Sequence, residues 1–165
     1  MKKLVSKLAQ KRRMQLFVAT HSSHISSRLD LRSAILPGKN RPVSLHELPE
    51  KTARFFMKAP DNNVPEFALA QRFILVEGDA EFILTDAFYR GLTGRAPEHD
   101  GVHIISIGGS SFRRYPELAR LLENRVAAVR DNDGDYQQNC VDHFAEILSP
   151  DIRVFGDENP DRSTF

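Results

Sequence analysis

The residues best suited to chemistry in this chain are acidic, and the first group of them consists of Glu77 and Glu81. Glu77 directly follows an apolar run at residues 73–76, which has the length of a buried strand, and Gly78 then starts a turn. Glu81 lies about one helical turn further along the chain. The spacing therefore allows both carboxylates to face one crevice, Glu77 from a strand end and Glu81 from the start of a helix.

The second acidic group, Asp131, Asp133 and Asp135, follows another apolar run at residues 126–129. Alternating carboxylates on an extended segment that turns at Gly134 can direct two or three oxygens to one point. Hard cations such as Mg²⁺ or Mn²⁺ prefer oxygen ligands and bridge to substrate phosphates. Carboxylates gathered this closely repel one another without a cation. The expected metal ligands are therefore the five carboxylates of both groups: Glu77, Glu81, Asp131, Asp133 and Asp135.

Each acidic group also has a simpler interpretation when it is taken alone. Sequences of the type Asp-x-Asp-Gly are common in plain turns, and Glu81 could simply favour the dipole at a helix start. Asp131 could also open an EF-hand loop, but the twelfth residue would then be Asp142 instead of the required glutamate. The joint placement of the two groups at one edge of a sheet is what favours a metal site.

Strands and helices alternate around these acids. Strands are predicted at residues 73–76, 102–107, 126–129 and 152–155, with helices at residues 81–89, 112–124 and 141–148 between them. Short turns between such elements imply an α/β fold, in which a parallel sheet is covered by helices on both faces. Ligands of these sheets bind at the carboxyl ends of the strands, which is where both acidic groups lie.

A glycine turn at residues 108–111 ends the strand predicted at residues 102–107. Backbone N–H groups in such a turn, just before a helix, can bind an anion such as phosphate. Arg113 and Arg114 follow the turn and are candidate contacts to nucleic-acid phosphates. An equally good interpretation is a tight turn followed by two solvated arginines.

The chain before the break at residues 60–65 has a different pattern. Residues 2–13 predict an amphipathic basic helix, residues 15–20 a short strand, and residues 33–36 and 42–48 two further strands. Because proline, aspartate and asparagine interrupt regular structure at the break, we predict two domains, residues 1–60 and residues 61–165.

Composition excludes several classes of protein. The formal net charge is +1, so the total charge does not identify a nucleic-acid binder. Cys140 is the single cysteine, which excludes an internal disulfide and agrees with a reducing compartment. No apolar run approaches the ~18–20 residues that cross a bilayer, and no signal peptide opens the chain. We expect a cytoplasmic protein with no membrane partner.

At Glu77-Gly78, Glu81 and Asp131-Asn132-Asp133 the chain resembles a Toprim domain, the fold shared by topoisomerases, bacterial primases and OLD-family nucleases. Residues 73–81 are similar to the Val-Glu-Gly-x-x-Glu stretch of the OLD family, and the similarity covers roughly residues 67–165. The resemblance implies a Toprim (Rossmann-like) sheet and Mg²⁺- or Mn²⁺-dependent hydrolysis of DNA, with RNA as the other possible substrate. The catalytic residues that it implies are Glu77, Glu81, Asp131 and Asp133.

Residues 17–25 resemble the Thr-His-Ser-x-His segment that closes the ABC-type ATPase core of OLD proteins. The family's histidine that matches His21 lies near the γ-phosphate of ATP. The resemblance therefore implies that residues 1–60 are the C-terminal remnant of an ATPase domain, and that the complete protein binds ATP and forms a homodimer. Without the downstream motif, two histidines after a strand would be unremarkable.

The chain also departs from the OLD pattern. It contains no Gly-x-x-x-x-Gly-Lys-[Ser/Thr] loop and no Walker B acids, so we do not expect this chain to hydrolyse ATP alone. Residues 163–165 end where the family has a Ser/Thr-x-Glu segment and a later catalytic lysine. The chain therefore reads as a fragment, and the sequence leaves open whether it cleaves DNA by itself.

Three other functions remain open at the level of sequence. The first is a catalytically incomplete metal-binding or regulatory Toprim module, and the second is another Toprim protein that performs nucleotidyl transfer. The third is a phosphoacceptor or flavodoxin-like signalling domain, which would explain Asp131 but gives no role to His21, Glu77 or Glu81. Substrate specificity, oligomeric state and a role in phage defence do not follow from the sequence.

Overall fold

The computed structural model describes residues 19, 31, 34–58 and 64–159 of the chain. The chain divides into two units, Met1–Leu69 and Ala70–Phe165, and each is described separately. The division predicted from the sequence lies between residues 60 and 61, whereas the helix α4 (Val64–Leu69) belongs to the first unit.

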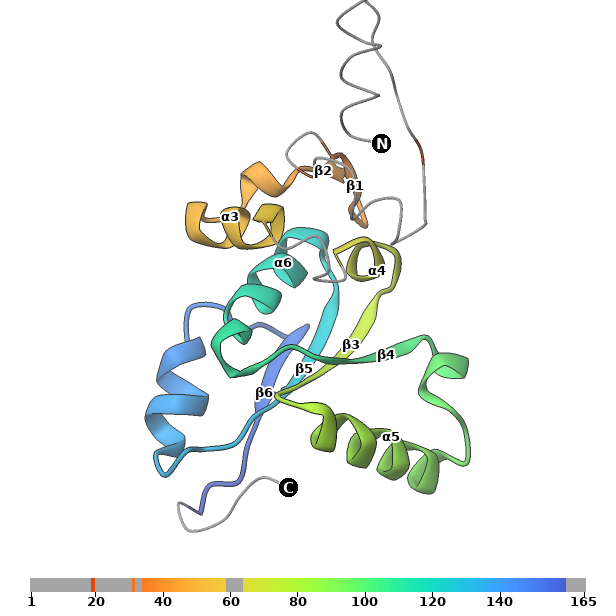
Figure 1. Ribbon diagram of the computed structural model, residues 1–165, viewed down its shortest axis with the longest axis vertical. Helices are drawn as coiled ribbons and strands as arrows, with labels where there is room; N and C mark the ends of the chain where they lie inside the picture. Colours follow the sequence, from red (N-terminus) through yellow and green to blue (C-terminus); the bar gives the residue numbers. More distant parts are fainter. Residues whose placement is uncertain (1–18, 20–30, 32–33, 59–63, 160–165) are drawn as a thin grey trace, which may run out of the picture. The chain divides into compact units, whose positions relative to one another are not determined.

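The second unit is built on a sheet of four parallel strands. These are β3 (Arg72–Val76), β4 (Val102–Ser106), β5 (Arg125–Val129) and β6 (Ile152–Phe155), in the spatial order β4-β3-β5-β6 (Figure 1). All neighbouring pairs are parallel. The four predicted strands are thus confirmed, and their carboxyl ends share one edge of the sheet.

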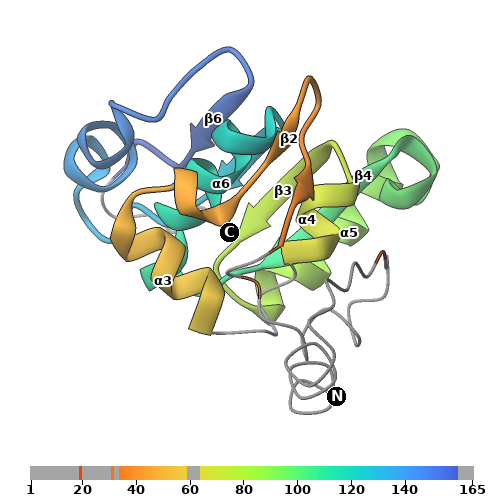
Figure 2. The same ribbon diagram turned by 90° about the horizontal axis from the view of Figure 1, so that it is seen from above.

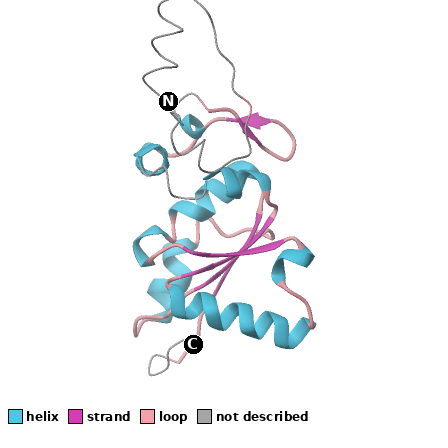
Figure 3. Cartoon of the chain, turned by 45° about the vertical axis from the view of Figure 1, so that its right-hand side comes forward, coloured by secondary structure: helices cyan, strands magenta, loops and turns pink. Residues whose placement is uncertain are grey.

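Helices cover both faces of this sheet, as the α/β prediction requires (Figure 3). The helix α5 (Asp79–Thr93) connects β3 to β4 and contacts β4 (Figure 2). The helix α6 (Arg114–Leu122) connects β4 to β5 and contacts β5 and β6. Because β4 and β5 lie on opposite sides of β3, right-handed crossovers place the two helices on opposite faces.

One face of the sheet forms the core of the second unit. Side chains alternate between the two faces of a strand, so every second residue of β3, β5 and β6 points to the same side. The buried residues on that side are Phe73, Leu75, Val126, Ala128 and Ile152. Leu118 and Leu122 of α6 and Phe144 from the connection between β5 and β6 are also buried. Their burial provides the main apolar stabilisation of the unit.

The connection between β5 and β6 differs from the helix predicted at residues 141–148. It consists of a π-helical turn at Gln137–Val141 and a 3-10 turn at Asp142–Phe144. The physical reason is local, because the Asp135 carboxylate accepts a hydrogen bond from the Gln138 N–H at 2.9 Å and starts the helical segment earlier.

The first unit contains a hairpin whose two strands have two residues each, together with short helices. β1 (Leu36–Pro37) pairs antiparallel with β2 (Pro42–Val43), so the strand predicted at residues 33–36 is found only at its last residue. The strand predicted at residues 42–48 is wrong beyond Val43. Ser44 and Glu47 form a capping box there, and it starts a 3-10 helix at Leu45–Glu47.

A further helix of the first unit, α3 (Glu50–Lys58), was not predicted, and it buries Phe56 and Ala53. The helix predicted at residues 2–13 and the strand predicted at residues 15–20 fall outside the described ranges, Ala19 apart. Among the helices in the described ranges, none is long and apolar enough to cross a bilayer.

Gly156 provides a test of the packing between β6 and the helical connection. A Cβ at this position would lie 2.9 Å from Cys140 Sγ and 3.0 Å from the Arg130 carbonyl oxygen. Gly156→Ala should therefore lower the free energy of unfolding by about 1–3 kcal/mol, because buried atoms must shift. The same substitution at Gly91 in α5 meets nothing within 4 Å and should raise stability by about 0.5–1 kcal/mol. Denaturant unfolding of both variants measures the contrast, and an equal effect at the two sites would contradict it.

Candidate metal centre

Glu77 follows β3 directly, and the neighbouring strand fixes its backbone. The Glu77 carbonyl oxygen accepts hydrogen bonds from the Gly108 N–H at 2.9 Å and from the Ser106 hydroxyl at 3.4 Å. Gly108 has a φ of +69°, which glycine adopts without strain. A Cβ added to Gly109 would lie 3.6 Å from Glu77 Oε2. The glycine turn after β4 therefore lies directly against the Glu77 carboxylate.

The Glu77 carboxylate is partly withdrawn from water and surrounded by charge. Its Oε1 atom is buried and has no hydrogen-bond partner within the described ranges. Burial raises the pKa of this carboxyl, the positive charge of Arg130 opposes that rise, and the charges of Asp133, Asp131 and Glu81 raise the pKa further. The carboxylates of both acidic groups therefore act on one another at this edge of the sheet.

Glu81 approaches this edge from the first turn of α5. Gly78 is the N-cap residue of that helix, with an extended backbone. A Cβ added to Gly78 would lie 2.9 Å from Glu81 Oε2, so the carboxylate of Glu81 lies over the turn that connects β3 to α5. This position agrees with its effect on the pKa of Glu77.

The loop that carries Asp131 and Asp133 is held by Asn132, whose side chain is buried. Asn132 Nδ2 donates to the carbonyl oxygens of Asp157 at 2.9 Å and Asn159 at 2.7 Å, and Asn132 Oδ1 accepts from the Gly134 N–H at 2.8 Å. These bonds attach the loop to the segment that follows β6. Asn132 was not singled out from the sequence, because two of its partners lie 25 and 27 positions away along the chain.

Asp135 has a structural role that competes with metal binding. Its Oδ1 atom accepts a hydrogen bond from the Gln138 N–H at the start of the helical segment that follows the acidic loop. Asp135 is not among the charges that shift the pKa of Glu77. Its assignment as a ligand stays a prediction.

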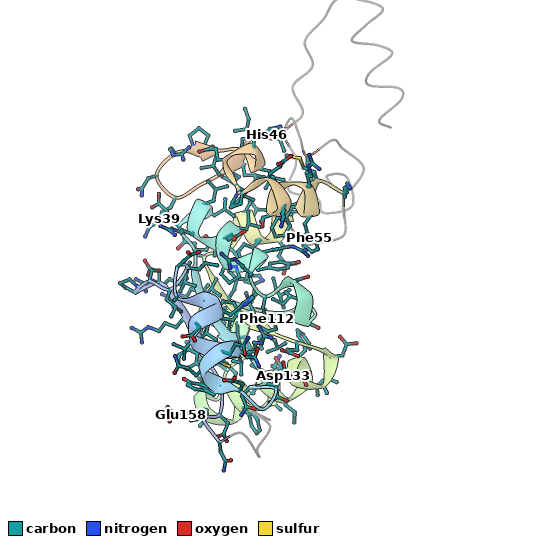
Figure 4. The ribbon with its side chains drawn as sticks, turned by 90° about the vertical axis from the view of Figure 1, so that its left-hand side faces the viewer. Lys39, His46, Phe55, Phe112, Asp133 and Glu158 are labelled. Carbon is teal, nitrogen blue, oxygen red and sulfur yellow. The ribbon has the colours of Figure 1, made fainter. Side chains whose placement is uncertain are left out.

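Arg130 lies between the two acidic groups and was not predicted to belong to the site. Its Nε atom is 3.7 Å from Glu77 Oε1, and its Nη2 atom is 3.5 Å from Asp133 Oδ2. The guanidinium also lies 5.7 Å from the ring centroid of Phe112 and 5.8 Å from that of Phe144. Phe112 and Asp133, labelled in Figure 4, lie in the same part of the second unit.

The two arginines predicted to contact nucleic acid differ in their surroundings. Arg113 forms ion pairs with Glu117 at 3.3 Å and with Glu146 at 3.0 Å, and it is exposed. Exposed pairs of this kind contribute little and can exchange a carboxylate for a phosphate. Arg114 is the first residue of α6. Their contact with nucleic acid stays a prediction, and His21 lies outside the part of the chain that the structure describes.

The donor atoms suit a hard cation, but they are not arranged as a closed cage. Within the described ranges, no three Asp, Glu, His or Cys side chains lie close enough to hold one ion. The groups still fit such an ion chemically, because the site is rich in carboxylate oxygens and Glu77 Oε1 is a buried oxygen without a hydrogen bond there. Binding a cation would therefore require the side chains to close around it.

Comparison with known proteins gave one match. Residues 69–133 match the family model described as "Overcoming lysogenization defect protein-like, TOPRIM domain". The matched segment runs from the residue before the second unit to Asp133, so it contains β3, β4, β5 and four of the five predicted ligands. No curated protein and no solved structure matches the chain. The match supports the Toprim part of the resemblance, and the four-stranded sheet has the arrangement of a Toprim, Rossmann-like fold.

The buried amide of Asn132 provides a test of how the acidic loop is held. Asn132→Ala removes both donors and the acceptor, leaves their partners unsatisfied, and should lower the free energy of unfolding by about 2–4 kcal/mol. Gln137→Ala is the matched control, since this exposed amide makes one hydrogen bond to Asp142 and should cost less than about 0.5 kcal/mol. Chemical denaturation compares the two, and similar values would show that Asn132 does not hold the loop.

The raised pKa of Glu77 predicts the pH dependence of stability in metal-free buffer. The pKa of the folded state lies above the ordinary value of 4.5, so the folded state keeps a proton that the unfolded state has lost. As the pH rises through that interval, the free energy of unfolding should fall. Glu77→Gln should abolish this part of the dependence.

Glu47 is the matched control for this pH experiment, because hydrogen bonds from Arg41 and Ser44 lower its pKa. Its contribution has the opposite sign, since it is present above the unfolded pKa and is lost as the pH falls through the folded pKa. Thermal unfolding between pH 4 and 8 compares Glu77→Gln with Glu47→Gln. Equal pH slopes in the parent protein and the Glu77 variant would contradict the burial of this carboxylate.

Proposed function

We propose that the second unit is the metal-binding core of a divalent-metal-dependent endonuclease of the OLD type, which hydrolyses phosphodiester bonds in DNA. The observation that carries the proposal is the half-buried Glu77 carboxylate at the carboxyl edge of the sheet, which is subject to the charges of Glu81, Asp131 and Asp133. The match of residues 69–133 to the OLD-like Toprim model supports the same reaction class.

Each carboxylate has a role that follows from its place in the fold. Asp131 and Asp133 would bind Mg²⁺ or Mn²⁺ from the loop after β5, with Glu81 on the other side from the first turn of α5. Glu77 would bind the metal or accept a proton from the attacking water. The metal supplies the charge that activates water and stabilises the leaving oxygen.

The substrate phosphate would approach the edge beside the glycine turn. Gly109 lies against the Glu77 carboxylate, so a phosphate near that turn would also be near the metal ligands. Arg113 and Arg114 follow the turn and could neutralise neighbouring phosphates of the DNA backbone. RNA presents the same phosphates, and DNA is proposed on the resemblance to OLD-family nucleases alone.

The remaining parts of the proposal concern the complete protein. Residues 1–60 would be the end of an ABC-type ATPase domain, with His21 near the γ-phosphate of ATP and a homodimer formed through that domain. We also propose a cytoplasmic location. The proposals about ATP and the homodimer rest on the resemblance of residues 17–25 to the OLD family, and the proposed location rests on the composition of the chain.

A regulatory metal-binding module is the second candidate, and one observation favours it. Arg130 lies between Glu77 and Asp133, and within the described ranges no three carboxylates can hold one ion as they stand. A module of this kind would bind Mg²⁺ or Mn²⁺ without cleaving a phosphodiester bond.

Substitution of the acids distinguishes the two candidates. Glu77→Ala and Asp131→Ala should each lower plasmid nicking in Mg²⁺ or Mn²⁺ by about 100-fold or more, because a metal ligand is lost. Asp151→Ala is the control, since Asp151 pairs with Arg125 at the opposite edge of the sheet and should leave nicking unchanged. Calorimetric titration with Mn²⁺ accompanies the assay. Binding of Mn²⁺ without nicking supports the regulatory module, and normal nicking by both acid variants rejects the assignment of these residues.

A further inference from the structure

Arg130 contacts carboxylates from both acidic groups. It follows β5 directly, and its backbone N–H donates to the Phe155 carbonyl oxygen at 2.9 Å. Its guanidinium then lies 3.7 Å from Glu77 and 3.5 Å from Asp133. A single positive charge therefore lies where two negatively charged strand ends meet.

Packing keeps this guanidinium in place. Its side chain is only 14% exposed, and the rings of Phe112 and Phe144 lie within 6 Å of it. Both rings are fully buried, and cations at this distance from an aromatic ring are attracted to it. The two rings come from different connections, the one before α6 and the one before β6. Arg130 is thus part of the packed interior, unlike the exposed Arg113.

A withdrawn arginine needs negative partners, and the half-buried Glu77 carboxylate needs a positive one, whereas the Asp133 carboxylate is exposed. Removing either partner from such a pair leaves a charge that is poorly solvated. Arg130 satisfies this requirement at the carboxyl edge of the sheet, with Glu77 and Asp133 as its partners. A divalent cation would satisfy the same requirement for the same two carboxylates. The arginine and the cation therefore compete electrostatically for one acidic edge.

We infer that Arg130 is the built-in counter-ion of the acidic edge: it holds Glu77 and Asp133 together when no metal is bound, and it lowers the affinity of that edge for a divalent cation. The second half of this inference rests on the metal site proposed above. Arg130 is a positioning residue in this scheme, since it acts on the ligands and is not itself a ligand.

The inference predicts opposite effects of one substitution in the absence and presence of metal. In a chelating buffer, Arg130→Gln should lower the melting temperature by several degrees, because the carboxylates lose their counter-ion. In a calorimetric titration with Mn²⁺, the same variant should bind about tenfold more tightly, because a positive charge a few ångströms from the ion is gone. Saturating Mn²⁺ should restore its melting temperature.

Two variants serve as controls. Arg130→Lys keeps the positive charge and should lie between the parent protein and Arg130→Gln in both measurements. Arg125→Gln removes an arginine that pairs with Asp151 at the opposite edge of the sheet, and it should leave the Mn²⁺ affinity unchanged. Unchanged or weaker Mn²⁺ binding by Arg130→Gln, while the parent protein binds Mn²⁺, would overturn the competition.

A double-mutant cycle in chelating buffer tests the first half without any metal. The loss of melting temperature caused by Arg130→Gln should be clearly smaller in a Glu77→Gln background, where one negative charge is already absent. An equal loss in both backgrounds would mean that Arg130 acts through packing alone, and the counter-ion role is then rejected. If Arg130→Gln fails to fold, recovery by Mn²⁺ or by Glu77→Gln supports the inference, and recovery by neither rejects it.

The same data separate this inference from the proposed function. If neither the parent protein nor Arg130→Gln binds Mn²⁺, the proposed metal site fails, and the competition fails with it. The double-mutant cycle in chelating buffer then tests the counter-ion role of Arg130 without reference to metal binding. If both proteins bind Mn²⁺ equally and neither nicks DNA, the regulatory module stands and the competition is rejected.

Discussion

The second unit is organised around negative charge that parallel strands bring to one edge of a sheet. In a parallel sheet the carboxyl ends of all strands lie together, so acids that follow different strands become neighbours. The effect is clearest at Glu77, because burial and the charges of three neighbouring acids raise its pKa. Such an edge is stable only when positive charge is nearby, and Arg130 supplies it within the protein. In the function proposed above, metal binding and catalysis would therefore depend on the same small set of charges as stability.

The backbone around this edge is held by contacts that do not depend on a metal. Hydrogen bonds from Gly108 and Ser106 fix the carbonyl group of Glu77, and the buried amide of Asn132 attaches the acidic loop to the segment after β6. If these carboxylates bind a metal ion as proposed, their fixed backbones would let side-chain rotation close the site around it. This arrangement explains how a site without a closed cage within the described ranges can still be suited to a divalent cation.

The functional interpretation combines two independent observations. The family match covers residues 69–133, which contain β3, β4, β5 and four of the five acids but not β6 or Asp135. The geometry adds what a family match cannot supply, namely the position of Arg130 between Glu77 and Asp133. The match supports nuclease or nucleotidyl-transfer chemistry of the Toprim type, whereas the arginine indicates that this chain controls its acidic edge through a charge of its own.

Local patterns in the sequence were enough to predict the second unit. The four strands, the helices on both faces and the acids at strand ends follow from hydrophobic periodicity and turn residues, which are properties of neighbouring positions. Side-chain caps account for the local errors, since Asp135 moved the start of a helical segment and Ser44 replaced a strand by a 3-10 helix.

Only the tertiary structure could reveal Arg130 and Asn132. Asn132 bonds to residues 25 and 27 positions away, and Arg130 meets a carboxylate on a different strand. A single sequence does not reveal such contacts, because they depend on which strands become neighbours in the sheet. The sequence by itself thus determined that carboxylates follow the strands. The pairing of β3 with β5 decided which charged side chains lie next to one another.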